Sequence, residues 1–128
     1  MKPLKGIRVI DFSTLLPGPL ATLMLVDAGA EVIKIEKIGG EDLRKSKPFL
    51  KGNSVLFSLL NRGKKSIEID LKNKENKIKI LQLIKKSDVL VEQFRPGVMK
   101  RLGLDWNTLK KINKKLVYCS ITGYGQTG

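Results

Sequence analysis

Short apolar segments recur along the chain and are separated by stretches with helical character. Residues 7–12 (IRVIDF) and 116–121 (LVYCSI) are rich in apolar and β-branched side chains, as expected for buried parallel strands. Residues 66–71 (SIEIDL) and 88–94 (DVLVEQF) are similar, whereas residues 30–36 (AEVIKIE) alternate apolar and polar positions. The pattern therefore predicts five strands.

Helices are predicted between these strands. Residues 20–28 (LATLMLVDA) are almost wholly apolar, which indicates a buried helix, and Gly29 suits its end because glycine readily adopts a positive φ. Asn73 caps a predicted helix over residues 74–86, in which apolar side chains recur at helical spacing. Shorter helices are predicted over residues 54–61, 96–102 and 106–113.

The alternation of strands with helices predicts an α/β fold with a mainly parallel sheet flanked by helices. Residues 13–19 (STLLPGP) form a connection, because their two prolines oppose helix in the residues before them. Residues 37–53 form a polar loop that is long for a structureless connection. We therefore expect this loop to be either functional or disordered.

Composition indicates one globular domain. The 128 residues are 41% apolar and 29% charged, which suffices for a modest core and disfavours disorder. No apolar run approaches the ~18 residues of a membrane-spanning helix, so no membrane partner is expected. The N-terminus lacks the features of a signal peptide, and the one cysteine, Cys119, cannot form an internal disulfide. We expect a cytoplasmic protein in which Cys119 is buried in a core strand.

The formal net charge of +13 raises the possibility of a nucleic-acid partner. The 25 basic residues are spread out, however, and no run of them is longer than two. Aromatic residues do not alternate with them, as stacking on single strands would require. We expect no nucleic-acid partner, and the charge fits either ordinary helix solvation by lysine or a small phosphate-rich ligand.

The residue types present limit the chemistry. There is no dinucleotide-binding G-x-G-x-x-G after the first strand and no P-loop. Histidine is absent, which excludes Ser-His and Cys-His nucleophilic pairs and His-ligated metals within these residues, so neither catalytic residues nor a metal site are expected. Cations do follow the predicted strands: Lys37, Lys72 and Arg95 would meet at the carboxyl edge of the sheet, where α/β proteins bind ligands. Such a group suits phosphates, although each cation alone is equally compatible with solvated surface.

Several motifs together resemble one family. The chain resembles the opening of the class III CoA-transferases (CaiB/BaiF type), which include formyl-CoA and carnitine CoA-transferases and α-methylacyl-CoA racemases. The resemblance covers nearly the whole chain in order, and it is carried by Asp11-Phe12, residues 16–20 (LPGPL), 27–36 (DAGAEVIKIE), 61–66 (NRGKKS), 70–72 (DLK), 94–99 (FRPGVM), 101–104 (RLGL) and 118–128 (YCSITGYGQTG).

The resemblance implies a Rossmann-like large domain that binds the nucleotide part of coenzyme A, within a two-domain subunit of an interlocked homodimer. Coenzyme A, as an acyl-CoA substrate, is the only cofactor implied. The positions that match the family's coenzyme A contacts are Lys37, Ile69, Asp70, Leu71, Lys72, Gln93, Phe94, Arg95 and Arg101. The family's catalytic residues correspond to positions after Gly128. Residues 1–128 are therefore expected to be the N-terminal part of the large domain, apparently truncated, with no second domain and no catalytic residue of their own.

Two motifs bear on the branch of the family. The turn at Pro17-Gly18-Pro19 and the run 118–128 favour the α-methylacyl-CoA racemases. In that case the reaction would remove and return the α-proton of a 2-methylacyl-CoA. The alternatives are an acyl-CoA:carboxylate CoA-transferase, which needs a carboxylate nucleophile, and a catalytically inactive remnant that still binds coenzyme A.

Overall fold

A five-stranded parallel sheet forms the centre of the fold. The computed structural model describes residues 1–127, and in it the strand order is β5-β2-β1-β6-β7, with every neighbouring pair parallel. This confirms the predicted α/β fold with a parallel sheet. The strands are β1 (Arg8–Asp11), β2 (Glu31–Glu36), β5 (Lys65–Glu68), β6 (Val89–Glu92) and β7 (Val117–Ser120).

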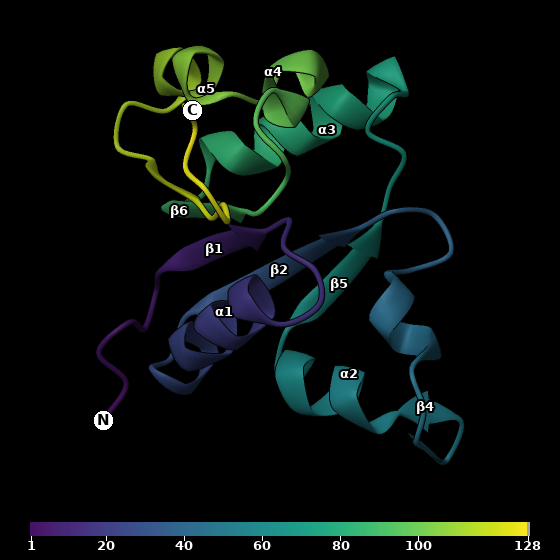
Figure 1. Cartoon of the computed structure of the whole chain (residues 1–128). Coiled ribbons are helices and arrows are strands. Elements are labelled where there is room, and N and C mark those ends of the chain that lie inside the picture. Colours follow the sequence, from purple (N-terminus) through teal and green to yellow (C-terminus); the bar gives the residue numbers. More distant parts are fainter. Residues whose placement is uncertain (128) are drawn as a thin grey trace.

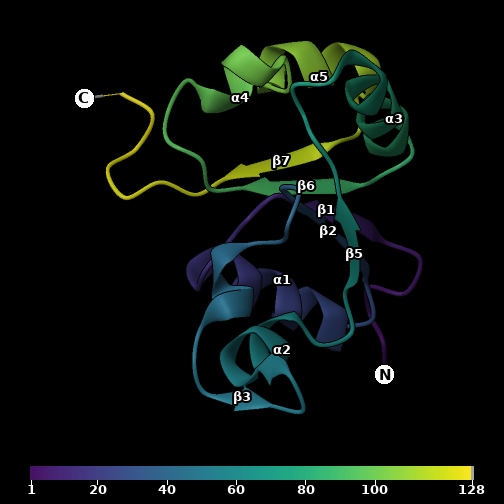
Figure 2. The ribbon, with the colours of Figure 1, turned by 90° about the vertical axis from the view of Figure 1, so that its right-hand side faces the viewer.

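Helices cover both faces of this sheet, with one group on each side (Figure 1). Figure 2 shows the sheet nearly edge-on, with α1 and α2 beneath it and α3, α4 and α5 above it. The bounds of these helices are α1 (Pro17–Asp27), α2 (Val55–Asn61), α3 (Lys74–Lys85), α4 (Val98–Leu102) and α5 (Trp106–Ile112).

The apolar strands are explained by this three-layer arrangement. Successive side chains of a strand point to opposite faces, so a strand with helices on both sides needs apolar residues at every position. Val9 and Ile10 of β1 are both fully buried, but they belong to different core clusters. Ile10 packs in the cluster that contains Ile80 and Ile84 of α3, whereas Val9 packs in the cluster against Val26 of α1.

The first helix begins earlier than predicted. α1 starts at Pro17 rather than at residue 20, and the Leu20 amide already donates to the Leu16 carbonyl at 2.9 Å. The first amides of a helix have no partner within it, so Pro17 and Pro19 lose nothing in the first turn. The proline-rich connection is therefore shorter than expected.

The long polar loop is ordered. It contains a 3-10 helix, η1 (Asp42–Lys45), and a small hairpin of β3 (Phe49–Leu50) and β4 (Asn53–Ser54). The strand predicted over residues 66–71 is shorter in the structure, where β5 begins at Lys65 and ends at Glu68. The structure thus gives the 37–53 loop local secondary structure of its own.

The expectation that Cys119 is buried in a core strand is wrong, because its strand lies at the edge of the sheet. Cys119 is exposed, not buried, and Val117 on the same side of β7 is 60% exposed. β7 lies at the edge of the sheet, and these two residues point away from Tyr118 because side chains alternate along a strand. Within residues 1–127, no helix has the length and hydrophobicity that crossing a bilayer requires.

Candidate functional site

The strand order creates a crevice at the carboxyl ends of the strands. From β1 the chain proceeds outward to β2 and β5, then returns to β6 on the other side of β1 and continues to β7. The order thus reverses between β1 and β6, and open α/β sheets bind ligands outside the carboxyl ends of the strands at such a reversal.

A cavity of about 570 Å³ lies there, beside the carboxyl ends of β1, β2, β5 and β6. Its walls are mainly apolar, and Phe12 and Phe94 meet across the β1–β6 reversal with ring centroids 6.4 Å apart. Six of the nine residues expected to contact coenzyme A line it: Lys37, Ile69, Asp70, Leu71, Lys72 and Phe94.

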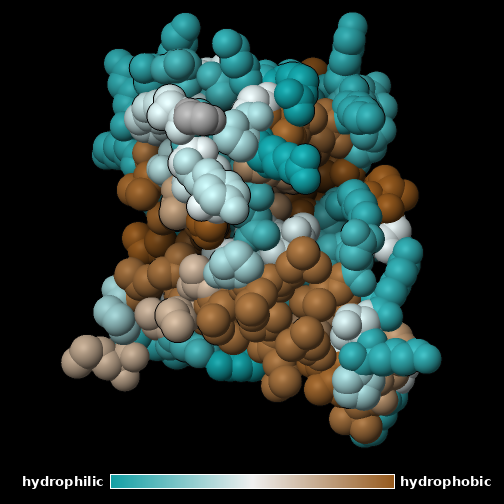
Figure 3. All heavy atoms as spheres, in the orientation of Figure 1, coloured by the Kyte–Doolittle hydropathy of each residue, from teal (hydrophilic) through white to brown (hydrophobic). Residues whose placement is uncertain are grey.

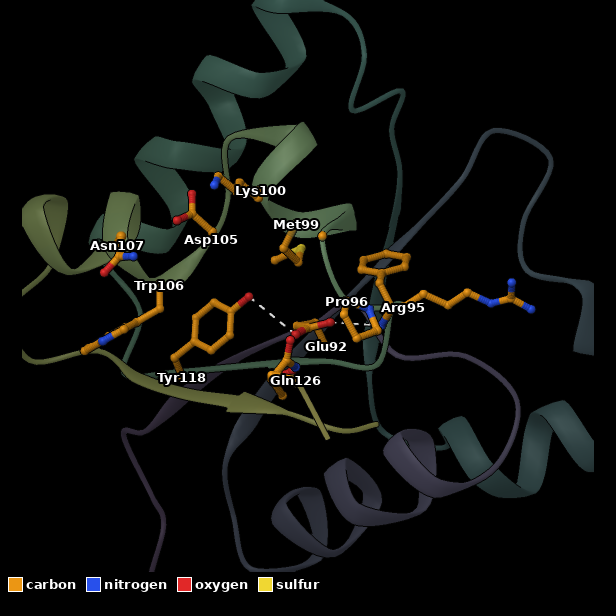
Figure 4. Close-up of a pocket in the computed structure, with 13 residues that line it drawn as sticks. Glu92, Arg95, Pro96, Met99, Lys100, Asp105, Trp106, Asn107, Tyr118 and Gln126 are labelled. Atoms are coloured by element: carbon orange, nitrogen blue, oxygen red, sulfur yellow. Dashed lines mark hydrogen bonds between the residues drawn. The ribbon is translucent and has the colours of Figure 1, made fainter. Parts of the chain in front are cut away.

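The remaining three expected residues lie elsewhere. The Gln93 amide is occupied by the backbone: its oxygen accepts from the Gly18 amide at 2.9 Å, and its nitrogen donates to the Thr14 carbonyl at 2.7 Å. Arg95 lines a second cavity, yet its side chain extends away from the other lining residues (Figure 4). Arg101 is exposed on α4, outside the linings of both cavities.

The expected convergence of cations is therefore only partly present. Lys37 and Lys72 line the same cavity, whereas Arg95 does not. The Lys37 ammonium lies 2.7 Å from an Asp42 oxygen, and this hydrogen bond lowers the pKa of the Asp42 carboxyl. Lys72 is exposed and has no ion pair among residues 1–127. The rim of the cavity thus presents one lysine without an acidic partner and a second in an exposed ion pair.

A buried polar cluster beneath the rim was not foreseen from the sequence. It consists of Asp11, Lys34, Glu41 and Lys64, whose side chains are at most 2% exposed. Lys34 pairs with Glu41, and Lys64 lies 3.2 Å from an Asp11 oxygen. Burial lowers the pKa of Lys64, and the neighbouring Asp11 charge opposes this shift.

Lys34 is buried although residues 30–36 alternate apolar and polar positions. The alternation predicted the strand but gave no environment for this lysine, and helices and the 37–53 loop cover both sides of β2. The usable signal was the location of a lysine in a strand of a doubly covered sheet, because a charge there must find a partner. The identity of that partner, Glu41, was not readable from periodicity.

Position 18 has room only for glycine, because the side chains of Ser13 and Gln93 approach its backbone closely. A Cβ atom built on it would lie 2.1 Å from the Ser13 Cβ and 2.5 Å from the Gln93 side-chain oxygen. The N-terminal turn of α1 therefore contacts both the end of β1 and the residue after β6. The glycine of the Pro-Gly-Pro turn serves this contact, whatever branch of the family the turn resembles.

The second cavity, about 480 Å³, lies between the ends of β6 and β7 and the helices α4 and α5. Trp106 and Tyr118 lie side by side there, with ring centroids 6.1 Å apart, and the Tyr118 hydroxyl points towards Glu92 (Figure 4). Burial and the Glu92 charge raise the pKa of Tyr118. Within residues 1–127, no group of three or more His, Cys, Asp or Glu side chains is placed to hold a metal ion.

Comparison with known sequences identifies relatives along the whole chain. It is 47% identical to acetyl-CoA:oxalate CoA-transferase of Acetobacter aceti over 98% of the chain, and 45% identical to succinyl-CoA:glutarate CoA-transferase of Mus musculus over its full length. The chain spans about a third of the length of these relatives, 33% and 30% respectively. Both names are those of CoA-transferases, so the expected preference for the racemase branch is not supported.

Solved structures also match this chain over nearly its whole length. The crystal structure of Rv3272 from Mycobacterium tuberculosis matches with a TM-score of 0.94 at 45% identity, over all of this chain and 36% of that one. A CaiB/BaiF family protein from Brucella suis matches with a TM-score of 0.93 at 40% identity, over 98% of this chain and 35% of that one. The family model described as "CoA-transferase family III" matches residues 4–128, and the chain belongs to this family.

Proposed function

We propose that the chain is the coenzyme A-binding part of an acyl-CoA:carboxylate CoA-transferase. The observation that supports this most directly is the cavity at the β1–β6 reversal, which six of the nine expected coenzyme A residues line. The names of the relatives add the substrate class, because each pairs an acyl-CoA with a carboxylate acceptor.

The lining of this cavity suits a ligand with an apolar body, and its two lysines offer contacts for phosphates at the rim, beside the acids Asp42 and Asp70. Apolar walls with a few placed polar groups are typical of cofactor sites. In our proposal the phosphates of coenzyme A lie against Lys37 and Lys72 on the rim, and the adenine or pantetheine contacts the apolar walls near Phe94. Lys37 would exchange Asp42 for phosphate, which is a small change because the pair is solvated.

The transfer reaction itself needs a carboxylate nucleophile. This group would attack the thioester carbonyl, expel the coenzyme A thiolate and form a mixed anhydride with the acyl group of the donor. The thiolate would then attack the enzyme-side carbonyl of the anhydride, which releases the donor carboxylate and leaves a thioester between the enzyme and coenzyme A. The acceptor carboxylate would attack this thioester to form a second anhydride, and the thiolate would take the acceptor acyl group from it and restore the enzyme carboxylate. We place this nucleophile outside residues 1–128, so that the role of this chain is to bind and orient the thioester.

Further protein is expected to contact α1. Leu16, Leu20 and Met24 are 55%, 39% and 62% exposed, and a continuous apolar surface extends over this helix (Figure 3). Large exposed apolar patches mark interaction sites. This supports the two-domain subunit and the interlocked homodimer that we propose for the full enzyme. We also propose a cytoplasmic location, in keeping with a single, unpaired cysteine.

Calorimetric titration with coenzyme A tests the proposal. Lys72→Glu is expected to weaken binding about tenfold, since a charge-assisted contact to phosphate is lost. Lys114→Glu is the matched control, because this exposed lysine precedes β7 at the opposite edge of the sheet and carries the same change in charge. No saturable binding by the wild-type chain, or equal losses in both variants, would contradict the proposal. Coenzyme A binding by the full enzyme without transfer to any carboxylate would instead indicate an inactive remnant.

A further inference from the structure

Residues 13–19, here called the 13–19 loop, comprise the connection after β1 and the first turn of α1, and they reach the rim of the cavity. Thr14 and Leu15 belong to the cavity lining. Leu15 has a φ of 61°, in the left-handed region that residues other than glycine rarely adopt. Such a conformation persists only where surrounding contacts enforce it, and it occurs preferentially at functional sites.

Side chains from distant elements supply these contacts. Lys34 of β2 donates to the Ser13 carbonyl at 2.8 Å, and Gln93 after β6 donates to the Thr14 carbonyl at 2.7 Å. Lys64, just before β5, donates to the Pro19 carbonyl at 2.9 Å. The backbone of the loop is therefore fixed at both of its ends by three side chains, two of which are buried ammonium groups.

Glu41 connects the same loop to the 37–53 segment. One of its oxygens pairs with Lys34, and the other accepts from the Leu15 amide at 3.4 Å. The residue whose conformation is unusual thus contacts the acid of a fully buried ion pair. Removing water from two charges is costly, and well-packed apolar residues are often equally stabilising, so stability alone gives a poor account of this pair.

We propose that Lys34 and Glu41 are positioning residues that hold the 13–19 loop so that Leu15 is presented to the bound coenzyme A. This inference rests on the proposed function, because it takes the cavity as the coenzyme A site. Lys34 lies outside the cavity lining, and Glu41 reaches the cavity wall with a side chain that is only 2% exposed. They act through the Ser13 carbonyl and the Leu15 amide.

The double variant Lys34→Met/Glu41→Gln tests the positioning role. It removes both charges together at similar side-chain volume, so neither charge is left buried and unpaired, and the global stability is expected to stay close to that of the wild type. The Leu15 and Gly18 amides are expected to exchange hydrogen about tenfold faster, measured by NMR, while the Ile10 and Leu90 amides in the core strands are unchanged. Coenzyme A affinity, measured by calorimetry, is expected to fall about tenfold, because a preorganised wall becomes mobile.

Asp27→Asn/Arg62→Met is the matched control. It removes an ion pair in which both partners are about half exposed, and it likewise leaves the net charge unchanged. Neither loop exchange nor coenzyme A affinity is expected to change in this variant. A second variant, Leu15→Gly, removes a side chain that is 52% exposed and should not impair folding. It is expected to weaken coenzyme A binding several-fold without altering exchange at Gly18.

The outcomes separate the two proposals. Wild-type exchange rates in the loop of the Lys34→Met/Glu41→Gln variant would overturn the positioning role. Faster exchange with unchanged coenzyme A affinity, or unchanged affinity in Leu15→Gly, would overturn it as well. If the wild-type chain itself does not bind coenzyme A, the proposed function fails. In that case the exchange rates alone decide whether Lys34 and Glu41 hold the loop, and the role of the loop in presenting Leu15 to coenzyme A is rejected.

Discussion

Glu36 and Arg44 form a bidentate ion pair that attaches the 37–53 loop to the end of β2. Arg44 Nε donates to one Glu36 oxygen at 2.7 Å, and a terminal guanidinium nitrogen donates to the other at 2.6 Å. The same carboxylate accepts from the Glu41 amide at 2.8 Å and from the Ser66 hydroxyl at 2.5 Å. Three segments that form one side of the cavity therefore meet at a single buried acid.

Glu36 is expected to make folding sensitive to acid. Burial raises the pKa of Glu36, but hydrogen bonds from Arg44, Ser66 and the Glu41 amide outweigh it and lower the pKa to about 2. Because the folded-state pKa lies below the unfolded value of about 4.5, the stabilisation is complete above pH 4.5 and is lost as the pH falls towards 2. Urea denaturation should show Glu36→Gln less stable than wild type by on the order of 2–3 kcal/mol at pH 7, with the gap closing towards pH 2. A gap that is independent of pH would contradict this assignment.

Arg44→Lys keeps the positive charge but removes the bidentate contact with Glu36. It also removes a guanidinium that lies 3.9 Å from the centre of the Phe57 ring. We expect a loss of about 1 kcal/mol in the free energy of unfolding, a modest value because Arg44 is 37% exposed. Arg62→Lys is the control: this arginine also binds a carboxylate through two nitrogens, but both partners are about half exposed, so no measurable change is expected. Equal losses in the two variants would show that burial of Glu36 does not matter.

The layered α/β fold was predictable from the sequence because local patterns determine it. A strand covered on both faces must be apolar at successive positions, as Val9 and Ile10 are, and this is visible in any short window. Helix caps are equally local: the Asn73 side chain accepts from the Asn76 amide, as its position predicts.

The interior of the candidate site was less predictable because long-range pairs determine it. Asp11 and Lys64 are 53 positions apart, and no periodicity relates them. Gln93 was expected to face the ligand, but its amide is used by the backbone of the 13–19 loop. α4 begins at Val98, two residues later than the helix predicted over residues 96–102, and the Arg95 side chain extends away from the second cavity (Figure 4).

Cys119 is expected to react with a thiol reagent in the folded state. Its exposure follows from the edge position of β7, whereas a thiol in a central strand such as β6 would be shielded. Titration of the native chain with a chromogenic disulfide should modify one thiol per chain at a rate close to that of the urea-unfolded chain. Modification that requires unfolding would place this face of β7 under other parts of the protein.

Gly18→Ala tests the close approach between α1 and the end of β1. The added methyl group would lie 2.1 Å from the Ser13 Cβ, and neither partner can move freely, because the Ser13 amide donates to Asp11 and the Gly18 amide to Gln93. Overpacking of this kind costs about 1–3 kcal/mol, which urea denaturation should show as a lower midpoint at constant slope. Gly123→Ala is the matched control, since nothing lies within 4 Å of its added methyl group. Equal midpoints for the two variants would mean that the 13–19 loop shifts to accommodate the methyl group, and a loop that shifts so readily could not be holding Leu15 in its left-handed conformation.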